Sequence, residues 1–329
     1  LYQMPNRFKK NAGFAENATE QQNIRDILGV NVGLYEVFES PINLIDLYDL
    51  GVGQEISASV QGGGQSMTYY SNLRYTFTDG PFNPQSTDFN GGSVGEANDQ
   101  YKKIFFSGNL NFFPSDVLTF RLQTSYTNSY VDVFQSGISI YAPTSTSRYS
   151  KPERVGQASP FDTFGLPFFA TPREGTFPTI NDLGNQGRVV FKADYFPTNS
   201  LSIDLSAGID YKDQRSESFL PFGYNVAGVA PNGNGQITIA NRQQLTLSFE
   251  TKAKWITDIT PDLKSSLVAG FQAYQEQLNS MSSVGTGFSG PGLEVLGATA
   301  SQTSSSYFQE IVNAGAFIQE QIDYSDWIY

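Results

Sequence analysis

Residues 201–211 read LSIDLSAGIDY and alternate strictly between two kinds of side chain. The odd positions, from Leu201 to Tyr211, are apolar, and the even positions are Ser, Asp or Gly. Because successive side chains of a strand point to opposite faces, this pattern predicts a β-strand with one apolar and one hydrophilic face. The predicted strand covers 200–211, and similar strands are expected at 54–61, 66–77, 102–113, 117–126, 187–196, 245–255, 263–276 and 307–322, with a further one beginning at Trp327.

The connections between these strands alternate in length. Short segments at 62–65, 114–116, 197–199, 258–262 and 323–326 alternate with long ones at 78–101, 131–186, 213–242 and 277–306. Aromatic residues flank the short turns, so they would gather at one level of the sheet. Outer-membrane barrels have this arrangement, with short periplasmic turns, long extracellular loops and aromatic girdles. The predicted fold is therefore all-β: a transmembrane antiparallel up-and-down β-barrel, partial, with about ten strands of a larger barrel.

The two faces of such a sheet have different surroundings. In lipid every backbone polar group must be paired inside the protein, so a sheet can cross only by closing on itself. The residues predicted to face lipid are Leu118, Phe120, Leu122, Leu201, Ile203, Leu205, Leu245, Leu247 and Phe249. Those predicted to face the lumen are Arg121, Arg188, Lys192, Asp204, Asp210, Glu250 and Lys252. A soluble sandwich also alternates, but its strands are shorter and its long loops are not confined to one end.

The composition excludes several functions. The 329 residues contain 20 Lys and Arg against 32 Asp and Glu, a net charge of −12, and neither Cys nor His. Cys/His zinc sites, histidine-ligated haem, disulfides and Ser-His-Asp or Cys-His relays are therefore excluded. Too few basic residues are present to neutralise a nucleic acid. We expect no enzyme activity, no catalytic residues, no metal and no cofactor.

The long loops hold the candidate contact residues for a transported substrate. Their aromatic density suggests stacking on sugar rings or apolar peptide side chains, and the alternative is that they form small cores of the loops themselves. The candidates are Tyr141, Arg148, Tyr149, Phe168, Phe169, Arg173, Phe222 and Tyr224. Carboxylates between Asp88 and Asp99 offer oxygen ligands for calcium, but their spacing does not match an EF-hand.

Residues 54–63, QEISASVQGG, followed by Thr68-Tyr69-Tyr70-Ser71, resemble the start of the barrel in TonB-dependent transporters of the SusC/RagA type. Segments 5–8, 289–294 and 316–321 carry further likeness. The resemblance implies active uptake of a bulky nutrient, an oligosaccharide or a peptide, across the bacterial outer membrane, through a plugged barrel of about 22 strands. It also implies two partners: the TonB complex, acting through a plug domain that is not in this chain, and a SusD-like lipoprotein lid.

The resemblance also predicts how the chain is organised. Residues 1–53 would connect plug to barrel and include a short helix at 20–28, because Thr19 and Gln22 have the spacing of a capping box. Residues 54–329 would form the N-terminal part of the barrel, which makes the chain an interior fragment. The alternative function is a passive outer-membrane channel or a surface adhesin, built on a barrel without energy coupling.

Overall fold

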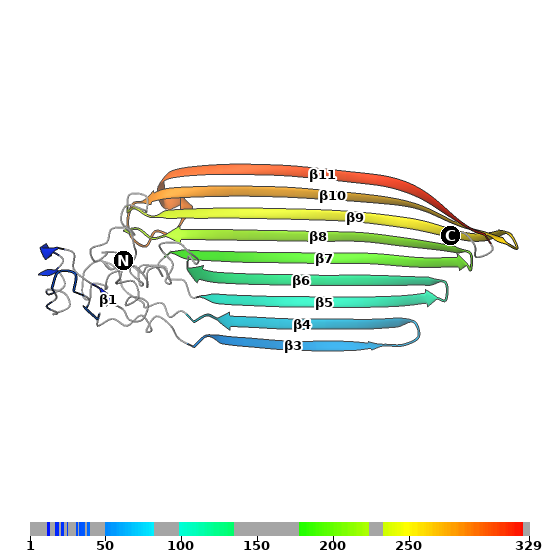
Figure 1. Ribbon diagram of the computed structural model, residues 1–329, viewed down its shortest axis with the longest axis horizontal. Helices are drawn as coiled ribbons and strands as arrows, with labels where there is room; N and C mark the ends of the chain where they lie inside the picture. The colour runs from blue at the N-terminus through cyan, green and yellow to red at the C-terminus, as the bar shows by residue number, and fades with distance from the viewer. Residues whose placement is uncertain are drawn as a thin grey trace.

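The computed structural model describes residues 50–81, 99–134, 178–223 and 233–324, together with isolated positions between 12 and 39. Within this part of the chain the main feature is one antiparallel sheet of nine strands (Figure 1). Every strand pairs with its neighbours in sequence, so the sheet order is β3-β4-β5-β6-β7-β8-β9-β10-β11. The fold is all-β and up-and-down, as the sequence predicts for part of a β-barrel.

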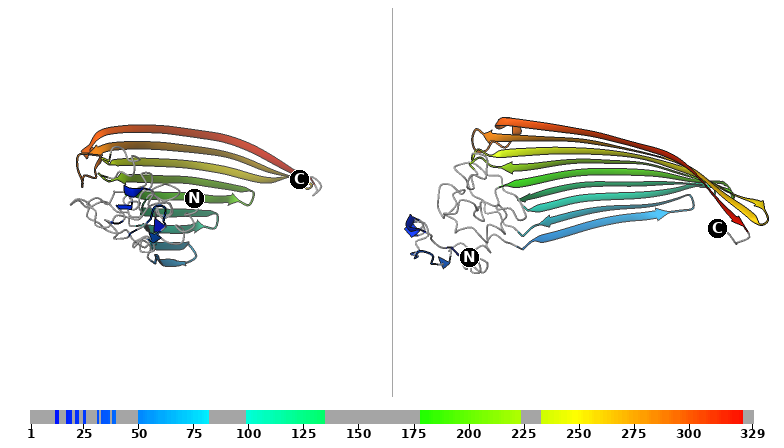
Figure 2. Two further views of the ribbon diagram at one scale, coloured as in Figure 1. Left: turned by 60° about the vertical axis from the view of Figure 1, so that its left-hand side comes forward. Right: turned by 45° about the horizontal axis from the view of Figure 1, so that its top comes forward.

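The strands lengthen along the chain, from 12 residues in β3 to 26 in β11. Their bounds are β3 Val52–Gly63, β4 Met67–Asp79, β5 Gln100–Ser115, β6 Leu118–Phe134, β7 Thr179–Thr198, β8 Leu201–Leu220, β9 Gln236–Thr260, β10 Leu263–Phe288 and β11 Thr299–Tyr324. A 3-10 turn, η3 Leu296–Ala298, precedes β11, and the two-residue strands β1 Ala12–Gly13 and β2 Phe38–Glu39 pair separately. Figure 2 shows that the sheet twists, most strongly in β9–β11, as strand sterics require.

The short connections all lie at one end of the sheet, called here the hairpin end. Residues 64–66, 116–117, 199–200 and 261–262 join β3–β4, β5–β6, β7–β8 and β9–β10. Aromatic side chains accompany these turns, since Phe112, Tyr195, Trp255 and Tyr324 are paired within the last rungs before them and are exposed. The longer connections lie at the opposite, loop end. This confirms the predicted alternation of short and long connections.

The predicted long loop at 277–306 is wrong. The β10–β11 ladder continues to Phe288 opposite Thr299, so only residues 289–298 connect the two strands. Polar residues such as Gln277 and Asn279 occupy positions where the alternation calls for apolar ones. The alternation therefore predicts a strand that ends at residue 276. Backbone hydrogen bonds do not need an apolar side chain, however, so the ladder continues after the alternation stops. Strands β6 to β9 also extend beyond their predicted ends into the segments predicted as loops.

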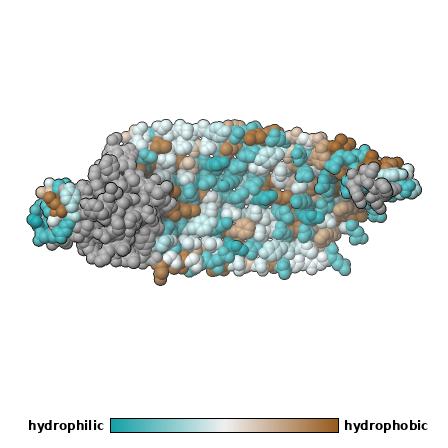
Figure 3. All heavy atoms as spheres, in the orientation of Figure 1, coloured by the Kyte–Doolittle hydropathy of each residue, from teal (hydrophilic) through white to brown (hydrophobic). Residues whose placement is uncertain are grey.

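The pairing register sorts side chains onto two faces. Ala207 of β8 lies opposite Phe191 and Phe249, whereas its neighbour Ser206 lies opposite Lys192 and Glu250. Directly paired residues share a face, so the sheet has one apolar and one polar face. Figure 3 shows a predominantly hydrophilic surface over the strands. Large hydrophobic residues stay exposed along the apolar face, among them Ile209, Leu247 and Phe271.

A small hydrophobic core lies at the loop end of β8–β10. Phe219, Ile237 and Phe288 are buried, with Ile237 only 1% exposed, and the Phe219 and Phe288 rings are 5.7 Å apart. Phe222, Ile239, Leu296 and Ala298 pack against them. The 289–298 connection therefore folds back over the strands here.

Other predicted elements lie wholly or partly outside the described residues. The predicted helix at 20–28 has helical backbone at residues 21, 22 and 25, its described positions. A strand beginning at Trp327 falls in 325–329, which the structure does not describe. Within the described ranges, no helix has the length and apolar character needed to span a membrane.

Candidate functional site on the polar face

Basic residues are concentrated on the polar face of the sheet. Ten of the twelve Lys and Arg in β3–β11 share it by register: Arg74, Lys103, Arg121, Arg188, Lys192, Lys212, Arg242, Lys252, Lys254 and Lys264. The two exceptions, Lys102 and Arg215, lie near the loop end. The ammonium of Lys102 is 5.8 Å from the centre of the Phe77 ring, and Arg215 forms a 3.0 Å ion pair with Glu217.

Towards the hairpin end, two aspartates of the polar face are paired with cations. Asp194 and Asp204 lie opposite each other across β7 and β8. Each is neutralised from the next strand outward: Arg121 of β6 is 2.5 Å from Asp194, and Lys252 of β9 is 3.6 Å from Asp204. Like charges placed directly opposite are destabilising, so the flanking cations allow the two carboxylates to be neighbours.

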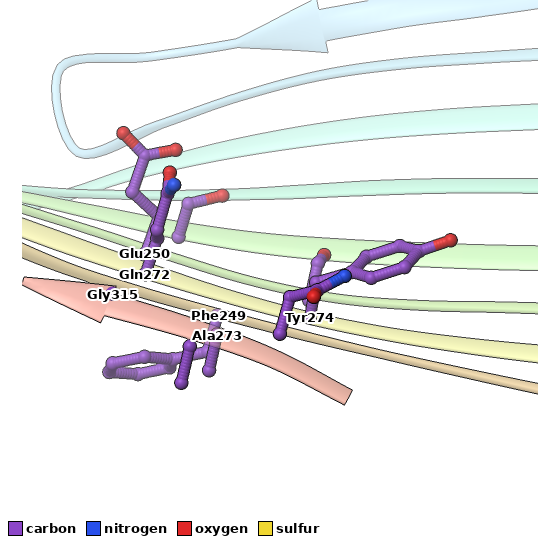
Figure 4. A pocket seen from close by; sticks show the side chains of 10 residues that line it. Phe249, Glu250, Gln272, Ala273, Tyr274 and Gly315 are labelled. Carbon is purple, nitrogen blue, oxygen red and sulfur yellow. The ribbon is translucent and has the colours of Figure 1, made fainter. Parts of the chain in front are cut away.

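A first recess lies on the polar face over β8 to β11. It has a volume of about 340 Å³, and small residues, Ser206, Ser248 and Gly315, leave space between larger polar ones. Figure 4 shows Glu250, Gln272 and Tyr274 projecting from one side of the sheet and Phe249 and Ala273 from the other. The recess therefore offers amide, carboxylate and phenol groups on the polar side.

A second recess adjoins the first towards the loop end, and Ser248 and Tyr274 line both. Its volume is about 480 Å³, and Gln186, Arg188, Asp210, Lys212 and Gln244 are among its lining residues. Gln186 donates to both carboxylate oxygens of Asp210, at 3.1 and 3.3 Å. Glu276, next to the recess, accepts from Gln244 at 3.0 Å and from the Tyr274 hydroxyl.

These recesses can bind polar and charged groups by hydrogen bonds. Among the described residues no group of three or more acidic, Cys or His side chains is placed to hold a metal ion. The arrangement therefore provides a hydrogen-bonding surface along the polar face of the sheet.

Solved structures of a peptide importer have a similar sheet. The RagAB importer in its closed-closed state aligns over 86% of this chain with a TM-score of 0.61 at 14% identity. A second RagAB transporter structure aligns over 84% (TM-score 0.62, 15% identity), and the open-open state over 83% (0.58, 16%). The likeness is one of fold.

This chain spans about a third of the RagAB chains, 31%, 30% and 30% of their lengths. No family model and no curated protein matches it. The neighbours in structure are described as transporters.

The register places all the residues predicted to face the lumen on the polar face and all those predicted to face lipid on the apolar face. That these faces meet water and lipid stays a prediction. Sequence reasoning missed Lys212 and Gln244, because the predicted strands 200–211 and 245–255 stop one residue short of them, and it missed Tyr274 within the predicted strand 263–276. The even positions of 263–276, which include Gln272 and Tyr274, carried the signal.

Most of the predicted substrate contacts lie outside the described residues: Tyr141, Arg148, Tyr149, Phe168, Phe169, Arg173 and Tyr224. The loop residues around Asp88 lie outside as well. Phe222 is described, and it packs against the Phe219, Ile237 and Phe288 core. For this residue the geometry favours the alternative of a small core at the loop end.

Proposed function

We propose that this chain forms part of the wall of an outer-membrane transporter that takes up a bulky nutrient, with the polar face towards the lumen and the apolar face towards lipid. Uptake is energised by the TonB complex through a plug domain, and a SusD-like lipoprotein covers the extracellular side. A peptide is the favoured cargo, because the similar structures are those of a peptide importer.

The observation that carries the proposal is the concentration of Lys and Arg on one of the two faces. A Lys or Arg on the lipid face near the bilayer midplane costs about 2–4 kcal/mol, and less near the interfaces. Ten of the twelve basic strand residues avoid that face, and Lys102 and Arg215 lie near the loop end. A soluble sheet would need a second layer over its apolar face, and within the described residues only 289–298 folds back onto the strands.

The proposal is tested by measuring uptake in the source bacterium. A strain lacking this gene and a strain lacking TonB are compared with the parent, using fluorescent peptide and oligosaccharide mixtures. We expect one of the two mixtures to enter the parent cells and to be excluded from both mutants.

The same experiment separates the alternatives. Uptake that needs this gene but survives loss of TonB indicates a passive channel. Surface binding without uptake indicates an adhesin. Either result contradicts energised transport.

A further inference from the structure

We infer that the recess around Arg188 and Lys212 binds a carboxylate of the transported peptide. This inference rests on the proposed function and makes it more specific, because it names the chemical group that the wall recognises. The two cations lie on the polar face of neighbouring strands. Arg188 of β7 lies opposite Asp210 in the ladder, and the next pair on the same face is Gln186 with Lys212 of β8, so the cations are diagonal neighbours.

The acidic residues beside these cations are already engaged by neutral groups. Asp210 lies directly opposite Arg188, yet both of its oxygens accept from the Gln186 amide. Glu276 accepts from Gln244 and from the Tyr274 hydroxyl. Within the part of the chain that the structure describes, neither Arg188 nor Lys212 forms an ion pair.

In the hairpin-end half of the same face, two acids are bound by cations instead. There Arg121 and Lys252 each pair with an aspartate. Lys192 and Lys254 of that half form no ion pair among the described residues. In the loop-end half, Asp210 and Glu276 accept hydrogen bonds from neutral groups. The cations Arg188 and Lys212 therefore keep N–H donors that a ligand can use.

The shape of the recess suits a small anionic group. Gly208 and Ser248 form part of its lining, and a Cβ at Gly208 would come within 2.7 Å of the Ser248 hydroxyl oxygen. Because Gly208 has no side chain, the recess has room for a small group beside Arg188 and Lys212. A guanidinium binds a carboxylate through two parallel hydrogen bonds, and an ammonium adds a third donor as a point charge.

A carboxylate can come from the C-terminus of a peptide or from an Asp or Glu side chain. The test uses the purified protein in detergent and three random pentapeptide mixtures. The first lacks Asp and Glu and has free C-termini, the second is its C-terminally amidated counterpart, and the third is amidated but contains Asp and Glu. Retained peptides are quantified by mass spectrometry.

We expect the wild type to retain the first or third mixture over the second. The variant Arg188→Gln/Lys212→Gln should reduce that preference about tenfold, the effect of losing hydrogen bonds to a charged group. Arg188→Lys/Lys212→Arg should keep it.

Lys254→Gln is the matched control, because it removes a polar-face cation outside both recesses. Heat-modifiable migration in gels checks that every variant is folded.

The two failures are distinguishable. If the wild type retains peptides without preference for a carboxylate, or if the double Gln variant keeps the preference, the carboxylate site is wrong while peptide binding stands. Unchanged preference would also follow if these cations bind acidic residues of a plug domain instead. If the wild type retains no peptide, both this inference and the peptide cargo fall.

Discussion

Gln277 and Glu310 face each other across β10 and β11, and the Gln277 amide donates a 3.0 Å hydrogen bond to the Glu310 carboxylate on the apolar face. Gln275 donates to the same oxygen. Ten positions along β11, Glu320 accepts from the Ser265 hydroxyl at 3.0 Å. Between the two carboxylates this face of β11 carries only Val312, Ala314, Ala316 and Ile318.

Ten residues of strand span about 33 Å. Tilted as in outer-membrane barrels, that length corresponds to the apolar band of about 25 Å. We therefore predict that Glu310 and Glu320 mark the two edges of the membrane on this strand. Ala314→Glu, at mid-band, should prevent assembly into the outer membrane. Glu310→Leu should be tolerated, since water at the interface can satisfy the freed amides. Yields of folded protein in outer-membrane fractions measure both, and equal yields would contradict these edges.

Leu205 and Ser206 test the assignment of faces on a central strand. Leu205 pairs with Ala193 and Thr251 on the apolar face, and Ser206 pairs with Lys192 and Glu250 on the polar one. We expect Leu205→Arg to destabilise the membrane-inserted state by about 2–4 kcal/mol. Ser206→Arg should have little effect. Urea unfolding in liposomes measures both, and similar losses at the two positions would show that the faces are misassigned.

The Arg121–Asp194 pair should be coupled energetically. The Asp194 side chain is 15% exposed and that of Arg121 is 46% exposed. A double-mutant cycle with Arg121→Gln and Asp194→Asn should give a coupling of about 0.5–1 kcal/mol, the upper part of the range for exposed pairs. Arg121→Gln should cost more than Asp194→Asn, because it leaves Asp194 beside Asp204 without its cation. A coupling of zero in urea unfolding would show that the contact does not stabilise the fold.

Gly235 holds the loop end of β9 in a conformation that other residues rarely adopt. Its φ is +75°, and a Cβ there would lie 2.7 Å from the Leu220 carbonyl oxygen and from the Phe288 ring. Gly235→Ala should therefore disturb the Phe219, Ile237 and Phe288 core and expose it to protease. Gly290→Ala is the control, because nothing lies within 4 Å of its Cβ position. Equal cleavage rates in limited proteolysis would contradict this local constraint.

The strands and their faces could be predicted from the sequence where the alternation is strict. In 201–211 and 245–255 every side chain except Thr251 matches its face, because an apolar neighbour lies opposite each apolar residue other than Leu205, which pairs with Thr251. The extent of the strands could not be predicted in this way. Beyond Tyr211 the apolar-face positions carry Asp213, Arg215 and Glu217, so the pattern ends while the backbone ladder continues.

The recess was missed for a related reason. Lys212 lies one residue past the predicted strand end, and Tyr274 is an aromatic residue on the polar face, where the pattern calls for hydrophilic ones. Amide partners such as Gln186 and Gln244 give no sequence signal, since their role depends on which residue lies across the ladder. Pairing between strands, which a single sequence does not contain, supplies that information.

The central claim is that the apolar face meets lipid and the polar face meets water. The absence of cysteine from the sequence allows nitroxide labels at single introduced cysteines, Ala207→Cys and Ser206→Cys, in the protein reconstituted in liposomes. Electron paramagnetic resonance then compares collisions with oxygen, which concentrates in lipid, and with a water-soluble nickel chelate. We predict that the label at 207 collides mainly with oxygen and that the label at 206 does not. The same collision profile at both positions would contradict the claim.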